Sequence, residues 1–245
     1  MVGASVASIV CILCAIILWN IAEKRGANTL FWAIMGAVFG PFAIPFVFLA
    51  KKNPAGASTL SERTHRVCPV ERAKGLDSRI RRWVQHPGKI LKPYIQRGMT
   101  VLDVGCGPGF FSIDMAELVG ESGCVIATDL QDGMLQIVKR KIQGTPLEKR
   151  IVLHKCEESR LGIKEKVDFV LVFYMFHEVP NQENFFEEIG SLLKADGKVL
   201  IVEPPFHVSK AAFQEMIEKA NATGFELVER PKVFLSKTAV FKKSE

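Results

Sequence analysis

The segment with the most evident chemical potential is rich in glycine and has the sequence Val101-Leu-Asp-Val-Gly-Cys-Gly-Pro-Gly-Phe-Phe. An apolar run leads to Asp103, and glycines follow as Gly105, Gly107 and Gly109. Where a strand turns into a helix, glycines let the backbone come close to a ligand, and the helix start presents free N–H groups. We therefore predict a small-molecule site at this turn, formed by Asp103 and the three glycines.

The spacing of these glycines separates two classes of adenosine-containing ligand. Nicotinamide dinucleotides are bound by G-x-G-x-x-G turns, whereas the spacing here is G-x-G-x-G, and Phe110 stands where that fingerprint has Gly or Ala. Asp103 would repel a pyrophosphate, but it can pair with a ligand's ammonium group. A nicotinamide-dependent oxidoreductase is therefore the disfavoured alternative.

A second acidic residue, Asp129, ends the next apolar run, twenty residues after Gly109. A carboxylate at the end of that strand can accept hydrogen bonds from both hydroxyls of a ribose. The alternative role for Asp129 is that of a helix N-cap or turn residue. Together the two carboxylates predict a ligand that carries an ammonium group and a sugar.

Several motifs follow one another in an order typical of one enzyme family. Residues 98–242 resemble the class I methyltransferases that use S-adenosylmethionine (SAM). Residues 103–109 are similar to the family's first motif, residues 173–180 to the segment after its fourth strand, and residues 193–204 to its fifth strand and the approach to it. The resemblance implies methyl transfer with SAM as the cofactor, and it leaves the methyl acceptor unidentified.

The same resemblance implies roles for three further positions. Asp129 matches the acid that binds the ribose hydroxyls, and Met134 matches the apolar residue beside the adenine. Glu157 stands where the family often has an Asp that contacts the adenine amino group, so this match is one of charge only. No metal site is predicted.

Three polar residues, Tyr174, His177 and Glu178, follow the fourth predicted strand. They fall at the carboxyl end of the central strands, where such sheets bind ligands. An acceptor that is a phenol, a thiol or an acidic carbon must lose a proton, and an imidazole of pKa about 6.5 is suited to accept it. We predict His177 as the general base, with a structural hydrogen-bonding role as its alternative, and Tyr174 as a second catalytic residue. His207 could line the same crevice.

Two further motifs predict no site. Glu203-Pro-Pro-Phe resembles the motif of enzymes that methylate amino groups of nucleic acids, but that motif follows the fourth strand and this segment follows the fifth, so no nucleic-acid partner is expected. Cys68 and Cys156 could bind a soft acceptor such as arsenic, although isolated cysteines more often fill space in a core. Cys106 is expected to occupy its position in the glycine turn because its side chain is small.

The first fifty residues differ sharply in composition from the rest. Their only charged side chains are Glu23, Lys24 and Arg25, which separate the apolar stretches 2–22 and 26–50. Each stretch exceeds the roughly 20 residues that cross a bilayer as a helix. We therefore predict a two-helix transmembrane hairpin over residues 1–50, a membrane localisation and, from the basic residues after the second stretch, a catalytic domain facing the cytoplasm. A cleaved signal peptide is the disfavoured alternative.

The segment 51–97 carries most of the positive charge. It holds twelve Lys or Arg against three acidic residues, and the whole chain has a net charge of +6. Such a basic linker is typical of segments that meet anionic headgroups. Within it, apolar residues at helical spacing from Asp77 to before Pro87 predict a short amphipathic helix that either lies on a membrane or covers the active site.

After Gly98 apolar strands and amphipathic helices alternate, which predicts a mostly parallel, Rossmann-like α/β sheet of the class I methyltransferase type over residues 98–245. The predicted activity is SAM-dependent methylation of a small, lipophilic acceptor such as a quinone precursor, a lipid or a thiol. The other alternative is a SAM-binding membrane adaptor without activity. The oligomeric state is left open.

Overall fold

The computed structural model describes residues 2–24, 29–44, 47, 70, 82, 85–205 and 207–244. The chain divides into two compact units, residues 1–63 and 64–245, and each is described by itself. Most of the predicted amphipathic helix and Cys68 lie outside the described residues. The three domain boundaries that we inferred from composition stay predictions.

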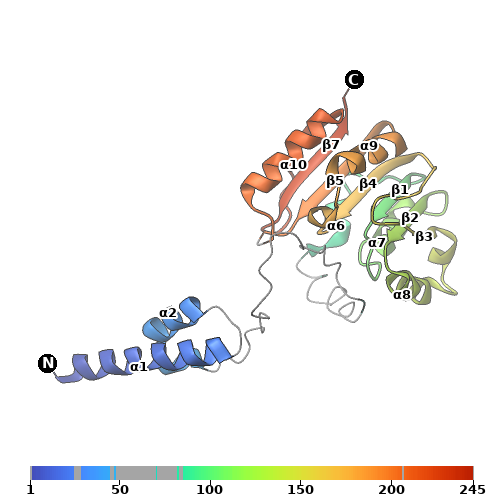
Figure 1. Cartoon of the computed structure of the whole chain (residues 1–245). Coiled ribbons are helices and arrows are strands. Elements are labelled where there is room, and N and C mark those ends of the chain that lie inside the picture. Colours follow the sequence, from blue (N-terminus) through green and yellow to red (C-terminus); the bar gives the residue numbers. More distant parts are fainter. Residues whose placement is uncertain are drawn as a thin grey trace. The chain divides into compact units, whose positions relative to one another are not determined.

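The second unit is built on one sheet of seven strands (Figure 1). The strands are β1 (Thr100–Val104), β2 (Cys124–Asp129), β3 (Ile151–Lys155), β4 (Val167–Phe173), β5 (Leu193–Glu203), β6 (Phe225–Glu229) and β7 (Lys237–Lys243). Their order is β3-β2-β1-β4-β5-β7-β6, and β1 to β5 pair in parallel, while β7 is antiparallel to both of its neighbours. The predicted Rossmann-like, mostly parallel sheet is confirmed.

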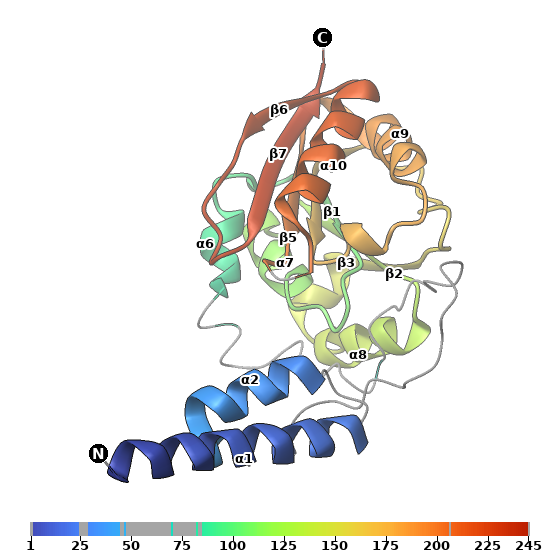
Figure 2. The ribbon, with the colours of Figure 1, turned by 60° about the vertical axis from the view of Figure 1, so that its left-hand side comes forward.

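Helices cover both faces of this sheet (Figure 2). They are α6 (Pro87–Leu91), α7 (Ser112–Val119), α8 (Asp132–Ile142), α9 (Gln182–Leu192) and α10 (Lys210–Ala222), with short 3-10 turns η3 (Pro146–Lys149) and η4 (Phe176–Glu178). One core cluster joins α6, α7 and α8 to one face, and a second cluster joins α9 and α10 to the other. Side chains alternate between the two clusters along β1, since Val101 belongs to one and Leu102 to the other. The sheet is therefore buried on both sides.

The parallel register brings the carboxyl ends of the central strands to one edge. Val104 of β1 pairs with Thr128 of β2, so Asp129 lies just beyond the point at which β1 ends. β4 and β5 end at the same edge, since Phe173 pairs with Val202. The sequence-distant segments that follow β1, β2, β4 and β5 therefore meet there.

The described end of the predicted amphipathic helix agrees with the prediction, since Gln85 is helical and His86 is not, so this helix stops before Pro87. A separate short helix that we did not predict, α6, begins at this proline. Proline is well suited to the first turn of a helix, because its fixed backbone angle fits and its missing N–H would have no partner there. α6 buries Leu91 against the sheet. The proline therefore follows the end of one helix and starts the next.

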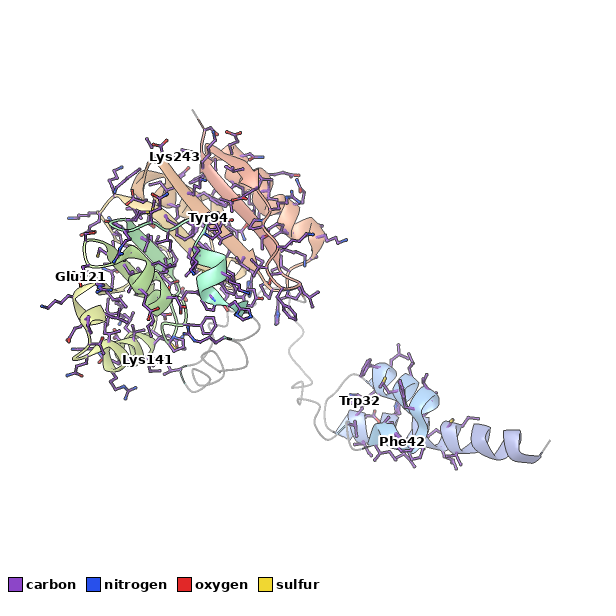
Figure 3. The ribbon with its side chains drawn as sticks, turned by 180° about the vertical axis from the view of Figure 1, so that it is seen from behind. Trp32, Phe42, Tyr94, Glu121, Lys141 and Lys243 are labelled. Atoms are coloured by element: carbon purple, nitrogen blue, oxygen red, sulfur yellow. The ribbon has the colours of Figure 1, made fainter. Side chains whose placement is uncertain are left out.

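The first unit contains α1 (Val2–Lys24), α2 (Thr29–Phe39) and the 3-10 turn η1 (Gly40–Ala43). α1 and α2 pack closely at Gly36, where an added Cβ would lie 2.7 Å from the carbonyl oxygen of Cys14. Trp32 is buried in the small core of this unit, whereas Phe42 is 82% exposed (Figure 3). The close helix contact thus needs a glycine.

The predicted transmembrane hairpin is not supported. Among the residues that the structure describes, no helix is both long enough and apolar enough to cross a membrane. Within the described residues of the second predicted span, α2 covers 11 residues, which rise about 16 Å, about half of the thickness of a hydrocarbon core. The glycine and proline at positions 40 and 41 end the α-helix in a 3-10 turn. The membrane localisation that we derived from the hairpin is therefore wrong.

Candidate active site

A cavity of about 530 Å³ opens at the carboxyl edge of the sheet. It lies within the size range of small-molecule and cofactor sites, roughly 300–1,000 Å³. The structure brings together on its wall seven of the nine predicted site residues, namely Asp103, Gly105, Gly107, Asp129, Met134, Glu157 and Tyr174. Gly109 and His177 are not among the residues that line it.

The glycine turn between β1 and α7 requires glycine for two separate reasons. Gly105 and Gly109 both have positive φ angles, +67° and +81°, which side chains other than glycine rarely tolerate. A Cβ at Gly105 would lie 3.0 Å from the side chain of Met175, and a Cβ at Gly109 would lie 3.0 Å from that of Val138 in α8. Gly109 therefore permits close packing between the turn and α8, while Gly105 keeps the cavity wall open.

Asp129 is held in place by the backbone of the turn beside it. Its two carboxylate oxygens accept hydrogen bonds from the N–H groups of Gly107 and Gln131, each at 2.9 Å. Burial raises the pKa of Asp129, and these backbone hydrogen bonds oppose the rise. Each carboxylate oxygen keeps a further lone pair. The carboxylate is thus fixed in orientation and still able to accept hydrogen bonds from a ligand in the cavity.

Asp103 is only 2% exposed. The hydroxyl of Ser112, in the first turn of α7, donates a hydrogen bond of 2.6 Å to one of its oxygens. A buried carboxylate is costly unless it is paired or hydrogen-bonded, and a cationic ligand group in the cavity would complete the pairing. Asp103 and Asp129 therefore line the same cavity, as two carboxylates at its floor.

The residues expected near an adenine lie on two different elements. Met134 is 2% exposed and comes from the start of α8. Glu157 is an exposed residue in the loop after β3, where its N–H donates to the carbonyl of Arg160 at 2.9 Å. The next residues of that loop are bound to α9, because the carboxylate of Glu188 accepts hydrogen bonds from the N–H groups of residues 161 and 162. The loop wall is thus anchored by a residue that the sequence did not single out.

Tyr174 has an unusual backbone for a residue with a side chain, with φ at +60°. Its N–H donates to the carbonyl of Val202 at 2.8 Å, which ties it to the end of β5. Its hydroxyl forms a hydrogen bond of 2.6 Å with the hydroxyl of Ser236, which lies in the loop between β6 and β7. The ring lines the cavity while the hydroxyl is engaged outside the predicted site.

His177 forms a pair with a buried glutamate. Its Nδ1 lies 2.6 Å from Oε2 of Glu203, which is 1% exposed, while the other oxygen of Glu203 has no hydrogen-bond partner among the described residues. The hydrogen bond with Glu203 raises the pKa of His177. His207 stacks on the His177 ring with centroids 6.1 Å apart. Neither histidine lines the cavity, although Glu178, next to His177 in η4, does.

The cysteines beside the cavity carry little nucleophilic character. Cys106 and Cys156 are buried and line the cavity. Burial raises the pKa of Cys156 to about 11, and it raises that of Cys106 as well. The reactive form of cysteine is the thiolate, so both side chains remain protonated thiols near neutral pH. Among the described residues no cluster of three or more potential metal ligands occurs.

Four functional neighbours were missed by sequence reasoning. Gln85 is 8% exposed and lines the cavity from a segment before α6. Ser112, Glu188 and Glu203 hold predicted residues or their loops in place. A Ser at a helix start is a capping signal, and Glu203 stands in a motif that we set aside. For Gln85 and Glu188 the sequence carries no such signal.

Comparison with known proteins places this site among methyltransferases. The family described as "Methyltransferase domain" matches residues 95–237 of the chain. The demethylmenaquinone methyltransferase of Oceanobacillus iheyensis is 34% identical over 109 residues, which are 44% of this chain and 46% of the relative. The ubiquinone/menaquinone biosynthesis C-methyltransferase UbiE of Cronobacter sakazakii is 25% identical over 146 residues, 59% of this chain and 57% of the relative.

A solved structure shares the fold as well. The SAM-dependent methyltransferase of Aquifex aeolicus superposes with a TM-score of 0.64 and 26% identity, over 72% of this chain and 98% of its own. The chain spans about half the length of the curated relatives it matches. The family match over residues 95–237 includes the residues that line the cavity apart from Gln85.

Proposed function

Because the chain belongs to the Methyltransferase domain family, we propose that it transfers a methyl group from SAM to a ring carbon of a small hydroquinone. The protein is a SAM-dependent methyltransferase, and this sets aside the oxidoreductase and the inactive adaptor as alternatives. The observation that carries the proposal is the composition of one cavity, in which Asp103, Asp129 and further acidic residues lie together with apolar and aromatic side chains. The relatives are named as quinone methyltransferases, and these names support the same acceptor class.

The residues at the floor of the cavity fit the methyl donor. Asp103 would pair with the ammonium group of the amino-acid tail, and Asp129 would accept hydrogen bonds from the ribose hydroxyls. Met134 and Glu157 would contact the adenine ring and its amino group. When bound, SAM supplies a methyl group on a sulfonium leaving group, so the protein's main task is to align the acceptor and exclude water.

The apolar part of the cavity lining suits a flat aromatic acceptor. It includes Phe173, Tyr174, Met175, Val179 and Phe185. Aromatic rings pack favourably in offset-stacked or edge-to-face geometry, and a thioether contacts ring edges favourably. A hydroquinone has two polar groups at opposite ends of a flat apolar ring, which matches a wall of this kind.

Methylation of a hydroquinone carbon requires the loss of a proton. Deprotonation of a ring hydroxyl makes the neighbouring carbon nucleophilic, and that carbon loses its own hydrogen as a proton after the new C–C bond forms. We assign the removal of the hydroxyl proton to His177. Glu203 holds its Nδ1, so the neutral ring would present Nε2 as the acceptor. Glu178 is the second candidate base, because it lines the cavity directly.

The proposal is tested by supplying the acceptor chemically. We would incubate the purified protein with SAM labelled in its methyl group and with a reduced 1,4-naphthoquinone that lacks a ring methyl, beside a catechol and an aliphatic thiol. We expect label in a carbon-bound methyl group of the naphthoquinone product alone. Label only in an O-methyl or S-methyl product would contradict the hydroquinone assignment. The Asp129→Ala variant serves as the control for donor-dependent transfer.

A further inference from the structure

A second cavity of about 350 Å³ lies beside the first, between α6 and the loop that joins β6 to β7. We propose that it receives an apolar substituent on the ring of the methyl acceptor, so that the two cavities form one extended acceptor site. The inference rests on the proposed function and extends it from the acceptor ring to the acceptor's side chain. Four observations on the described residues carry it.

The two cavities share a wall. Gln85 lines both of them and is 8% exposed. It lies directly before His86 and Pro87, at the start of the segment that forms one side of the second cavity. The two cavities are thus adjacent at this side chain, and a ligand that passes it would reach from the first cavity into the second.

Tyr174 connects the opposite wall of the two cavities. Its ring lines the first cavity, and its hydroxyl bonds to Ser236 at 2.6 Å. Ser236 in turn orders the loop of the second cavity, since its N–H donates to the carbonyl of Val233 at 2.8 Å and its hydroxyl donates to that of Phe234 at 3.1 Å. Val233 and Phe234 line the second cavity. A movement of this loop would therefore change the position of Tyr174.

Backbone strain gathers at the same junction. Three residues other than glycine have a positive φ in the described part of the chain, His86 at +41°, Tyr174 at +60° and Leu235 at +52°. His86 lines the second cavity, Tyr174 the first, and Leu235 stands between Phe234 and Ser236. Such conformations persist where the surroundings over-determine them and occur preferentially at ligand sites. Their clustering favours a binding role for the junction.

The lining of the second cavity selects an apolar group. Ile90, Pro93 and Val233 contribute aliphatic surface, and Tyr94 and Phe234 contribute rings. Tyr94 stacks on Phe169 of β4 with centroids 5.5 Å apart, and it lies beside α6 (Figure 3). Burial and a hydrogen bond to Glu229 raise the pKa of Tyr94, so its ring stays neutral. Lys89 and Lys232 also line the cavity, where their methylene stems can cover an apolar chain while the ammonium groups stay in water.

The experiment uses the complete chain and a series of reduced naphthoquinones that carry no ring substituent or an n-alkyl substituent of increasing length. For the wild-type protein we expect KM to fall by up to about fourfold for each added methylene until the cavity is full, as burial of apolar surface requires. Because the substituent lies away from the reacting carbon, kcat should stay the same along the series. The measured quantity is the ratio of KM between the unsubstituted and the longest acceptor.

Two variants test whether the second cavity causes this ratio. Ile90→Phe narrows the cavity and should reduce the KM ratio, because a shorter length of the chain can then be buried. Phe234→Ala, at a side chain that is 60% exposed and tolerates truncation, should reduce the ratio in part. Val228→Phe on β6 is the matched control, since Val228 is 44% exposed and lines neither cavity. Thermal melting shows whether each variant is folded.

The outcomes separate the inference from the function on which it rests. If the unsubstituted acceptor is methylated and the wild-type KM is the same for every chain length, the second-cavity inference is wrong and the proposed function stands. An unchanged KM ratio in both Ile90→Phe and Phe234→Ala also overturns the inference. If no member of the series is methylated, the proposed function fails, and the inference fails with it.

Discussion

The two sides of the first cavity are built by different kinds of contact. On the donor side, Asp129 is fixed by backbone N–H groups of the adjoining turn, and its partner Gly107 lies at the end of the neighbouring strand. On the acceptor side, Tyr174 and His177 are fixed by the side chains of Ser236 and Glu203, which come from distant segments. The donor side thus depends on backbone geometry and the acceptor side on pairs of side chains.

This difference indicates which part of the site tolerates a change of side chain with little effect on its geometry. A change of side chain leaves the backbone bonds of the donor turn intact, provided that its glycines and its two carboxylates remain. A change in either member of an acceptor-side pair repositions the other member. One donor site can therefore serve different acceptors. Variants on the donor side should change SAM affinity, whereas variants on the acceptor side should change turnover.

The largest effect is expected on the donor side, for Asp129→Ala. The substitution removes the hydrogen bonds of a carboxylate to the ribose, and bonds to charged groups contribute about 1.5–3 kcal/mol each, so SAM affinity should fall by about 100-fold or more. Titration calorimetry with SAM measures the change. Asp132→Ala is the control, because Asp132 is an exposed residue that pairs with Lys155 at 2.8 Å. An unchanged SAM affinity in Asp129→Ala would remove Asp129 from the donor site.

A smaller effect, confined to turnover, is expected for His177→Ala. Loss of a general base costs about tenfold or more in kcat, while SAM affinity should change little, since we assign donor binding to Asp103 and Asp129. Steady-state kinetics with the naphthoquinone acceptor measure both quantities. Glu178→Gln is made in parallel. A normal rate in His177→Ala together with a slow Glu178→Gln would assign the proton transfer to Glu178.

The dependence of turnover on pH tests the His177–Glu203 pair. The hydrogen bond with Glu203 raises the pKa of His177 above its ordinary value of 6.5, so the neutral base form appears only at higher pH. kcat of the wild type should therefore rise with pH through this raised pKa. Glu203→Gln removes the carboxylate that raises the pKa of His177, so the rise of kcat should move to lower pH. If kcat rises over the same pH range in both proteins, Glu203 does not determine the pH at which kcat rises.

The smallest effect is expected for the contact between Tyr174 and Ser236. A neutral hydrogen bond contributes about 1 kcal/mol, so Tyr174→Phe should raise the acceptor KM by about fivefold with SAM affinity unchanged. Ser236→Ala should have the same effect, and the double variant should be no worse than either single variant. Additive effects of the two substitutions would mean that the hydroxyls act separately.

The residues that we propose for the donor could be located from sequence because their signal is local. Asp103, the glycines and Asp129 stand at fixed distances around two strand ends, and the alternation of strands and helices fixes the topology. The resemblance to a known family added Met134 and Glu157. Every one of these residues except Gly109 lines the cavity, and Gly109 packs the turn against α8 instead.

The acceptor side could be predicted only in part, because its partners are distant in the chain. Tyr174 and Ser236 are 62 positions apart, and nothing at Ser236 signals its role. Glu203 was visible in the sequence, but the pattern alone does not show that it faces His177. The hairpin failed for another reason, since its length was taken from composition, whereas the helix over the second stretch ends after Phe39. Composition does not report where a helix breaks.

The insertion of β7 between β5 and β6 also governs the order in which the sheet can be completed. Among the described strands β6 pairs with β7 alone, and β7 supplies the partner for the free edge of β5. During synthesis, residues 225–229 thus leave the ribosome with no strand to join, and the edge of β5 stays open until residues 237–243 have followed. The wall that carries Ser236 can therefore be completed only after residues 237–243 have been synthesised.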